Sequence, residues 1–144
     1  MPRKVLAGEV TLRELVEAYK KQIEARNEEV NAYVYLDFES AFQQADEIQK
    51  KVKNGTTGSL LGAVMGIKDV ICERGKPTTC ASNILDGFES VYNATVIDRL
   101  EAEDAIFIGR LNMDEFAMGS TNEYSRYGAA KNPHDTTKVT GGSS

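Results

Sequence analysis

The stretch LGAVMGIKD, residues 61–69, is a glycine-interrupted apolar run that ends in a charged pair. A short apolar run bounded by turn residues is typical of a buried or half-buried strand. Such a strand would deliver Lys68 and Asp69 at its end. The chemistry of the protein is therefore expected near this strand end.

Outward from that stretch, residues 105–109 (AIFIG) predict a second buried strand. A helix precedes it, for which Asn93 is a plausible N-cap and Val96, Ile97 and Leu100 supply apolar positions. A helix followed within a few residues by an apolar strand is half of a βαβ unit. The sequence therefore favours an α/β fold.

The N-terminal third predicts two helices separated by a strand. Residues 11–14 (TLRE) have the form of a capping box, and apolar residues at helical spacing continue to about Arg26. Residues 31–36 (NAYVYL) are rich in aromatic and β-branched residues, which favour a strand. A second helix is predicted over residues 38–53 and is terminated by Asn54 and Gly55.

The last part of the chain differs from the rest in having little periodicity. A short helix is predicted over residues 113–118, and residues 119–144 contain no periodic element. A structureless stretch of this length is usually functional or disordered. The adjacent carboxylates Asp114 and Glu115 would not face each other on a helix, so a structural or solvent-facing role is favoured over a catalytic pair.

Composition limits the classes of function. The 144 residues fit one domain, and 41% hydrophobic and 27% charged residues are ordinary for a globular protein. A net charge of -5 argues against nonspecific attraction to nucleic acid. No run suits a signal peptide or a membrane span, so a cytoplasmic location is expected. Cys72 and Cys80, with His134, do not match a redox pair or a zinc site, and two reduced thiols are predicted.

Taken singly, the candidate catalytic residues have ordinary explanations. Lys68 could be a surface lysine paired with Asp69. The terminal Gly-Gly-Ser-Ser, residues 141–144, could be a phosphate-cradling turn, although it lacks the lysine of a Walker motif, or a flexible tail. Neither motif alone predicts a function.

Several segments, in their order along the chain, resemble one family, the amidase-signature hydrolases. The resemblance is close over about residues 60–144 and looser before them. Within the family, residues 78–82 and 112–120 are similar to the transamidase subunits rather than to the fatty-acid-amide or malonamide hydrolases. The segments that carry the resemblance are residues 66–69 (GIKD), 76–82 (KPTTCAS), 93–96 (NATV), 109–120 (GRLNMDEFAMGS), Gly128, 131–133 (KNP) and 141–144 (GGSS).

The resemblance implies a Ser-Ser-Lys triad that cleaves a carboxamide. It assigns Lys68 as the base and Ser143 as the relay serine, on a cis peptide bond, with Ser144 beside it. A base lysine must be uncharged, and the apolar run before Lys68 is what an uncharged amine requires. Met118, Gly119 and Ser120, together with Ser144, would line the substrate pocket. For Met118 to Ser120 the alternative is plain packing at a helix end.

The resemblance also implies the architecture, a mixed central sheet flanked by helices. Residues 1–144 would be the N-terminal portion of a single amidase domain, with N-terminal helices over about 8–54 and a truncated signature core over about 60–144. The nucleophilic serine of the family lies in a further Gly-Gly-Ser motif, so the isolated chain is expected to be inactive. Glu103 stands where family members commonly have a helix-ending glycine, which predicts a strained left-handed residue there.

The transamidase likeness implies release of ammonia from glutamine for the amidation of Glu-tRNA(Gln) in translation. The implied partners are the B and C subunits of a heterotrimer, and Glu-tRNA(Gln) would be contacted indirectly through the complex. ATP and Mg would be used by the partner, and no cofactor or metal is implied in this chain, nor any membrane contact. Two alternatives stay open: a stand-alone amide hydrolase, and a non-catalytic remnant.

Overall fold

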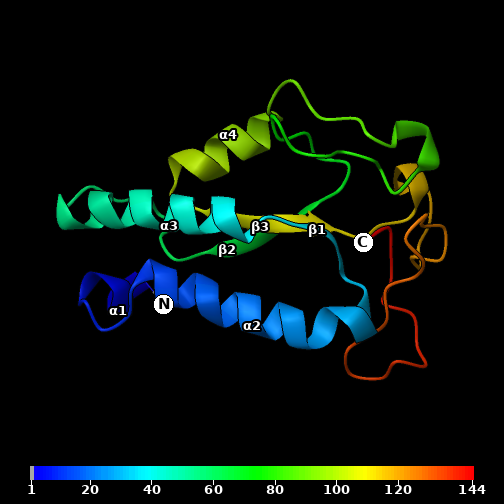
Figure 1. Cartoon of the computed structure of the whole chain (residues 1–144), viewed down its shortest axis with the longest axis horizontal. Helices are drawn as coiled ribbons and strands as arrows, with labels where there is room; N and C mark the ends of the chain where they lie inside the picture. Colours follow the sequence, from blue (N-terminus) through cyan, green and yellow to red (C-terminus); the bar gives the residue numbers. More distant parts are fainter. Residues whose placement is uncertain (1) are drawn as a thin grey trace.

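The computed structural model describes residues 2–144 (Figure 1). It is a mixed α/β structure in which helices enclose a small sheet. Two single-turn 3₁₀ helices, η1 and η2, interrupt the loops. The elements, in chain order, are α1 (Pro2–Leu6), α2 (Leu12–Val30), β1 (Tyr33–Leu36), α3 (Phe38–Lys53), β2 (Val64–Lys68), η1 (Asn83–Leu85), α4 (Thr95–Ala102), β3 (Ile106–Leu111) and η2 (Glu115–Ala117).

The sheet has the strand order β1-β3-β2, so the last strand in sequence lies in the centre. β2 pairs with β3 in parallel, and β1 pairs with β3 antiparallel. The parallel pair is connected through α4, which confirms the βαβ unit expected from the sequence. Lys68 pairs with Leu111, so the ends of β2 and β3 meet at one edge of the sheet.

Two apolar clusters cover the two faces of the sheet. On one face, α2 and α3 pack against Ile106 and Ile108, and on the other α4 packs against Ile67 and Phe107. Figure 1 shows α2 and α4 on opposite sides of the strands. β3 is buried on both faces, and this explains why its sequence is a nearly continuous apolar run.

A side chain from α3 completes the hydrogen bonding of β3 where β1 is too short to reach. β1 pairs only with Gly109 to Leu111. Next to this paired part, Gln44 accepts a hydrogen bond from the Phe107 amide at 2.9 Å and donates one to the Phe107 carbonyl at 3.4 Å. An unpaired backbone group buried here would be costly, so Gln44 ties α3 to the sheet.

The N-terminal predictions are confirmed closely. The capping box of α2 is formed by Thr11 and Glu14, and α3 has the predicted bounds. α2 runs four residues beyond the expected end at Arg26 and stops at Asn31, which adopts a left-handed conformation with φ 54°. Asparagine tolerates this conformation well, so it replaces the glycine that often ends a helix.

Two sequence predictions around α4 are wrong. Asn93 is not the N-cap, because its side chain instead accepts a hydrogen bond from the Arg74 amide at 2.7 Å, and Ala94 occupies the cap position without a side-chain bond. Glu103 has φ -96° and is unstrained, whereas Asp104, one residue later, has φ 65°. The aspartate carboxylate accepts a bond from the Gly58 amide at 2.6 Å, which stabilises this left-handed residue.

The helix predicted over residues 113–118 is reduced to η2. Phe116 and Ala117 have positive φ values of 51° and 61°, which a continuing α-helix does not allow. From Ala117 to Ser144, all of which the structure describes, no further helix or strand follows, in agreement with the aperiodic sequence. Across residues 2–144, no helix combines the length and apolar character needed to span a membrane.

Candidate active site at the end of the central strands

Lys68 and Ser143 lie together although 75 residues separate them in the sequence. Lys68 is the last residue of β2, and its Nζ donates a short hydrogen bond to Ser143 Oγ. The peptide bond between Gly142 and Ser143 is cis. The structure therefore brings together the amine and the hydroxyl singled out from the sequence.

Asp69 does not pair with Lys68, so the surface ion pair considered from the sequence is not what the structure contains. The Asp69 side chain is 1% exposed and receives hydrogen bonds from the Thr79 hydroxyl at 2.5 Å and the Ala81 amide at 3.1 Å. Its carbonyl accepts a bond from the Cys80 amide at 3.1 Å. These bonds occupy the Asp69 carboxylate in the interior, directly after the strand end that carries Lys68.

A buried arginine, which the sequence motifs did not single out, supports the same strand end. Arg110 is 1% exposed, and its guanidinium lies 3.3 Å from Glu73 and 3.9 Å from Asp69. It also donates to the carbonyls of Pro77 at 3.0 Å and Ile71 at 2.5 Å. The available signal was an arginine directly after the strand predicted over residues 105–109, because such a side chain must find acceptors if the buried strand continues.

Burial dominates the electrostatics of this cluster. It lowers the pKa of Arg110, while the carboxylates of Glu73 and Asp69 oppose that shift. It also raises the pKa of Glu73, against the attraction of Arg110. Both directions show that removal from water is unfavourable for the two groups, as is common for buried pairs. Their role here is to hold the loop of residues 71–78.

The backbone of Ser143 is held by the loop that follows β3. The Asp114 amide donates to the Ser143 carbonyl at 2.6 Å, and the Asn122 side chain donates to the same oxygen at 3.4 Å. Asp114 is fully buried, which agrees with the structural role favoured for it over a catalytic one. Glu115 is exposed and accepts a bond from the Ser82 hydroxyl at 2.5 Å.

Several residues with positive φ lie in the segments around Lys68 and Ser143. Left-handed backbone outside glycine is uncommon and costs on the order of 1 kcal/mol per residue, and it often marks functional loops. The Phe116 amide bonds to the Cys80 carbonyl at 3.0 Å, so two of these residues brace each other. The five involved are Cys80, Ala81, Phe116, Ala117 and Asn122.

The proposed substrate residues lie around the same loop but in different surroundings. Met118 is 74% exposed, so packing in the core at a helix end is wrong for this side chain. Gly119 contacts the Asp114 carboxylate, and the Ser120 backbone lies against Gly142. Ser144 lines a cavity of about 290 Å³ together with buried Asn112 and Asn122 and with other residues. Their contact with a substrate stays a prediction.

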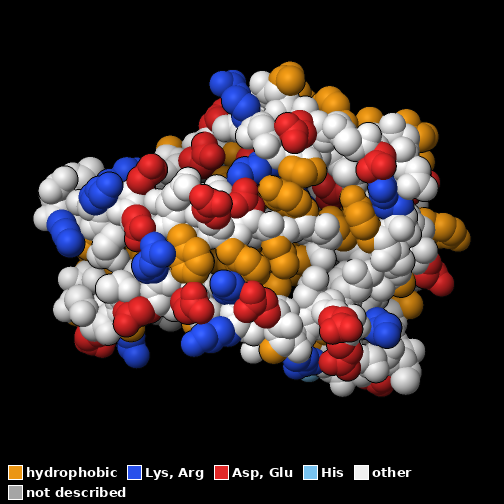
Figure 2. Space-filling model, viewed as in Figure 1, with side chains coloured by type: hydrophobic (Ala, Val, Ile, Leu, Met, Phe, Trp, Pro, Cys, Tyr) orange, Lys and Arg blue, Asp and Glu red, His pale blue; other side chains and the backbone are white. Residues whose placement is uncertain are grey.

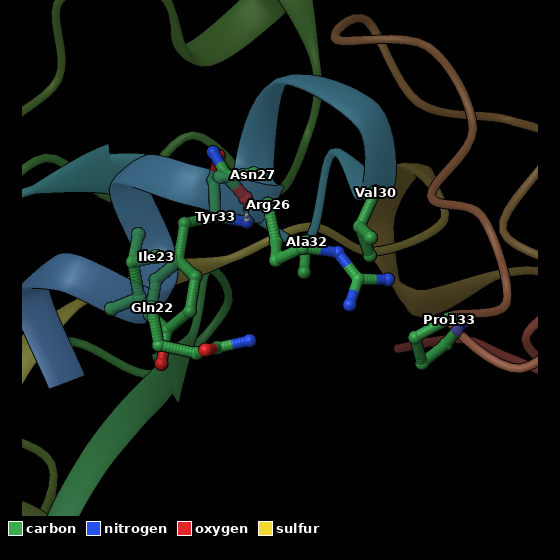
Figure 3. A pocket seen from close by; sticks show the side chains of 8 residues that line it. All are labelled: Gln22, Ile23, Arg26, Asn27, Val30, Ala32, Tyr33 and Pro133. Carbon is green, nitrogen blue, oxygen red and sulfur yellow. Dashed lines mark hydrogen bonds between the residues drawn. The ribbon is translucent and has the colours of Figure 1, made fainter.

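A second hollow lies elsewhere, between the C-terminal half of α2 and the loop that carries Pro133 (Figure 3). Figure 3 shows α2 side chains, among them Ile23, Arg26 and Val30, on one side and Pro133 on the other. The groove has a volume of about 190 Å³ and is mostly apolar. It lacks a pair of groups suited to proton transfer, which is why the Lys68–Ser143 pair is the better candidate site.

Residues 2–144 contain no group of three or more His, Cys, Asp or Glu residues arranged to hold a metal ion. Cys72 and Cys80 are free thiols, and burial raises the pKa of Cys80. On the face seen in Figure 2, acidic and basic side chains are interspersed rather than gathered into a basic patch.

Comparison with known proteins identifies the class to which this fold and this site belong. Residues 14–144 match the family model described as Amidase, and the chain belongs to this amidase-signature family. Among curated relatives, the A subunit of the glutamyl-tRNA(Gln) amidotransferase from Chlorobium chlorochromatii (strain CaD3) is 49% identical over 141 residues, which are 97% of this chain. The chain spans about 30% of that relative's length.

Solved structures agree on the fold. A structure described as a vestigial protein complex that reveals the origins of an s-triazine catabolic enzyme has a TM-score of 0.93 at 32% identity, over 99% of this chain and 32% of the other. The A subunit of the glutamyl-tRNA(Gln) amidotransferase from Thermotoga maritima has a TM-score of 0.70 at 28% identity, over 93% of this chain and 29% of the other.

Proposed function

We propose that Lys68 and Ser143 are the base and the relay serine of a Ser-Ser-Lys amidase centre. The observation that carries this proposal is the hydrogen bond from Lys68 Nζ to Ser143 Oγ. An amine bonded to a hydroxyl can take its proton if the amine is uncharged, and the hydroxyl can then take a proton from a second hydroxyl that attacks the substrate carbonyl. The attacking serine belongs to the further Gly-Gly-Ser motif of the family.

The chemistry divides into a proton path and a binding surface. In the attack, the proton of the nucleophilic serine passes to Ser143 Oγ while the Ser143 proton passes to Lys68 Nζ. A proton then passes from Lys68 through Ser143 to the leaving nitrogen, which departs as ammonia as the carbon–nitrogen bond breaks. The acyl group stays on the nucleophilic serine as an ester until water cleaves it. Met118, Gly119, Ser120 and Ser144 are the residues we assign to holding the amide.

The substrate and setting we propose follow the likeness to the Chlorobium amidotransferase. Glutamine would be the amide, and its ammonia would serve the conversion of Glu-tRNA(Gln) to Gln-tRNA(Gln) in the cytoplasm. The B and C subunits would be partners, with ATP and Mg bound by the partner rather than by this chain. The 49% identity to the A subunit of that amidotransferase supports this choice.

A chimera tests this function. Residues 1–144 would replace the matching segment of the Chlorobium A subunit, and the product would be combined with its B and C subunits. We expect the chimera to release ammonia from glutamine, and Lys68→Ala or Ser143→Ala to lower the rate by about 10²-fold or more. Lys51→Ala is the matched control, because Lys51 pairs with Asp104 at the opposite end of β3. Full activity in either site variant would refute the assignment.

A second candidate is a stand-alone amide hydrolase. It is favoured by the TM-score of 0.88 to a peptide amidase, at 27% identity, against 0.70 to the Thermotoga amidotransferase subunit. The same chimera distinguishes the two functions. Ammonia release that is unchanged by omitting the B and C subunits would support the stand-alone hydrolase.

A further inference from the structure

We propose that Asp114 is a positioning residue, whose buried carboxylate fixes the Ser143 loop against Lys68. This inference rests on the proposed function of the Lys68–Ser143 pair. Asp114 touches neither reacting atom. It acts through the backbone of the segment that carries Ser143.

Asp114 is bonded to two loops at once. Its carboxylate accepts hydrogen bonds from the Asn122 amide at 2.9 Å and the Tyr124 amide at 3.1 Å. Its own amide donates to the Ser143 carbonyl at 2.6 Å. One residue therefore joins the turn of residues 119–124 to the backbone of Ser143.

The packing around the carboxylate leaves no spare room. A Cβ atom added to Gly119 would lie 2.2 Å from the Asp114 Cγ, and one added to Gly142 would lie 2.5 Å from its Oδ2. Both glycines thus bring their backbones directly against the carboxylate. Since Gly142 immediately precedes Ser143, the position of the carboxylate sets how closely that loop approaches Lys68.

Asn122 strengthens this arrangement. Its Nδ2 donates to the Ser143 carbonyl at 3.4 Å, and its Oδ1 accepts from the Ala130 amide at 2.6 Å. Asn122 is 1% exposed and has φ 61°, so its amide is aimed at Asp114 by a left-handed turn. Loss of the carboxylate would leave buried amides without an acceptor, and the turn would have to move to reach water.

A matched control lies at the other end of β3. Asp104 is also 1% exposed, and its carboxylate accepts from the Gly58 amide at 2.6 Å and from Lys51 at 2.7 Å. It resembles Asp114 in burial and in its number of donors but has no contact with the Ser143 loop. A change at Asp104 should therefore perturb packing without separating Lys68 from Ser143.

The test is nuclear magnetic resonance of the 144-residue chain, observing the through-space contact between the Lys68 Hε and Ser143 Hβ protons. We expect this contact in the wild type and in Asp104→Ala, and its loss in Asp114→Ala and in Gly142→Ala. Asp114→Asn, which keeps an acceptor oxygen, should restore it in part. Gly142→Ala crowds both the Asp114 carboxylate and the Ser120 backbone from the loop side. A contact that persists in this variant would therefore count against the proposal even if Asp114→Ala fails to fold.

The outcomes separate the two proposals. A contact that persists in Gly142→Ala or in a folded Asp114→Ala overturns the role of Asp114 and leaves the Lys68–Ser143 site intact. A contact missing from the wild type overturns the positioning role together with the pairing it depends on. Normal contacts combined with inactive chimeras would count against the proposed function alone.

Discussion

The two halves of the molecule are held together by different forces. In the α2–α3 half, apolar side chains such as Leu12 and Ile108 are fully buried, and the backbone bonds are those of regular helices and strands. In the half that carries the site, side chains such as Asp69, Arg110 and Asp114 are buried and bonded to loop backbone. The first half is stabilised by removing surface from water, and the second by satisfying polar groups.

The difference teaches that the site depends on a polar interior. No buried side-chain nitrogen or oxygen in the described residues 2–144 lacks a hydrogen-bond partner. A network in which every group is paired has few ways to rearrange, so it fixes loops that have no periodic structure of their own. The apolar half supplies the sheet, and the polar half places Lys68 opposite Ser143.

The largest effect is expected from Arg110→Ala. Removal of the guanidinium leaves Glu73 buried without its partner and frees the carbonyls of Ile71 and Pro77. We expect a loss of about 4 kcal/mol in the free energy of unfolding, measured by urea denaturation. Exposed Arg13→Ala, whose side chain is 58% exposed in its pair with Asp46, is the control. Equal losses in both variants would contradict the distinction between the halves.

The next effect probes the apolar half. The Ile108 side chain is fully buried and packs in the α2–α3 core. We expect Ile108→Ala to lower the free energy of unfolding by about 3 kcal/mol through lost contacts and a cavity. The Lys68–Ser143 contact should survive in the folded protein, as seen by magnetic resonance. Its disappearance would show that the two halves are not separable.

A smaller effect is expected at the start of α2. Thr11→Ala removes the hydroxyl that accepts from the Glu14 amide at 3.1 Å and so breaks the capping box. We expect a cost of about 1 kcal/mol, measured by urea denaturation. Thr11→Ser, which keeps the hydroxyl, should stay near the wild type. Equal destabilisation by both substitutions would argue that the threonine methyl, not the cap, is what matters.

The smallest effect is a pH dependence from the ion pair of Lys76 with Asp37, 2.5 Å apart. Burial opposes both shifts, but the hydrogen bond and charge of the partner outweigh it, lowering the pKa of Asp37 and raising that of Lys76. The charge of Asp37 therefore stabilises the fold at pH values above its ordinary pKa of 3.8. This stabilisation is lost as the pH falls below that value, through the lowered pKa of the folded state. The charge of Lys76 stabilises the fold at pH values below its ordinary pKa of 10.5. This stabilisation is lost as the pH rises above that value, through the raised pKa of the folded state.

Because both groups are partly solvated, solvent screening should keep the pair below about 1 kcal/mol. The check is to measure the free energy of unfolding against pH for the wild type and Asp37→Asn. The two curves should be separated most between the ordinary pKa values of the two groups and should converge outside that interval. A constant separation at every pH would show that the pair does not contribute through its charge.

The sequence predicts the structure of the α2–α3 half better than that of the half that carries the site. The bounds of α3 and the capping box of α2 were predictable because periodic burial and capping are local properties of the chain. Residues 113–118 were not, since Phe116 and Ala117 leave helical space and the Phe116 amide bonds to the distant carbonyl of Cys80. Arg110 was missed because its partners lie more than 30 residues away in the sequence.

Within the candidate site, resemblance to a family supplied what local patterns could not. Lys68 at a strand end was visible from the apolar run before it, but its partner was not, because Ser143 lies in an aperiodic segment. The support given by Asp114 also depends on tertiary contacts, with Gly119 and Gly142 closing on its carboxylate. A sequence alone shows neither the distance nor the burial of such a group.

The most direct test of the central claim is a double-mutant cycle on ammonia release by the chimera, using Lys68→Met, Ser143→Ala and the double variant. Two groups on one proton path fail together, so the account predicts that the double variant is no slower than the slower single variant. Independent effects that multiply in the double variant would contradict it, because Lys68 and Ser143 would then act separately.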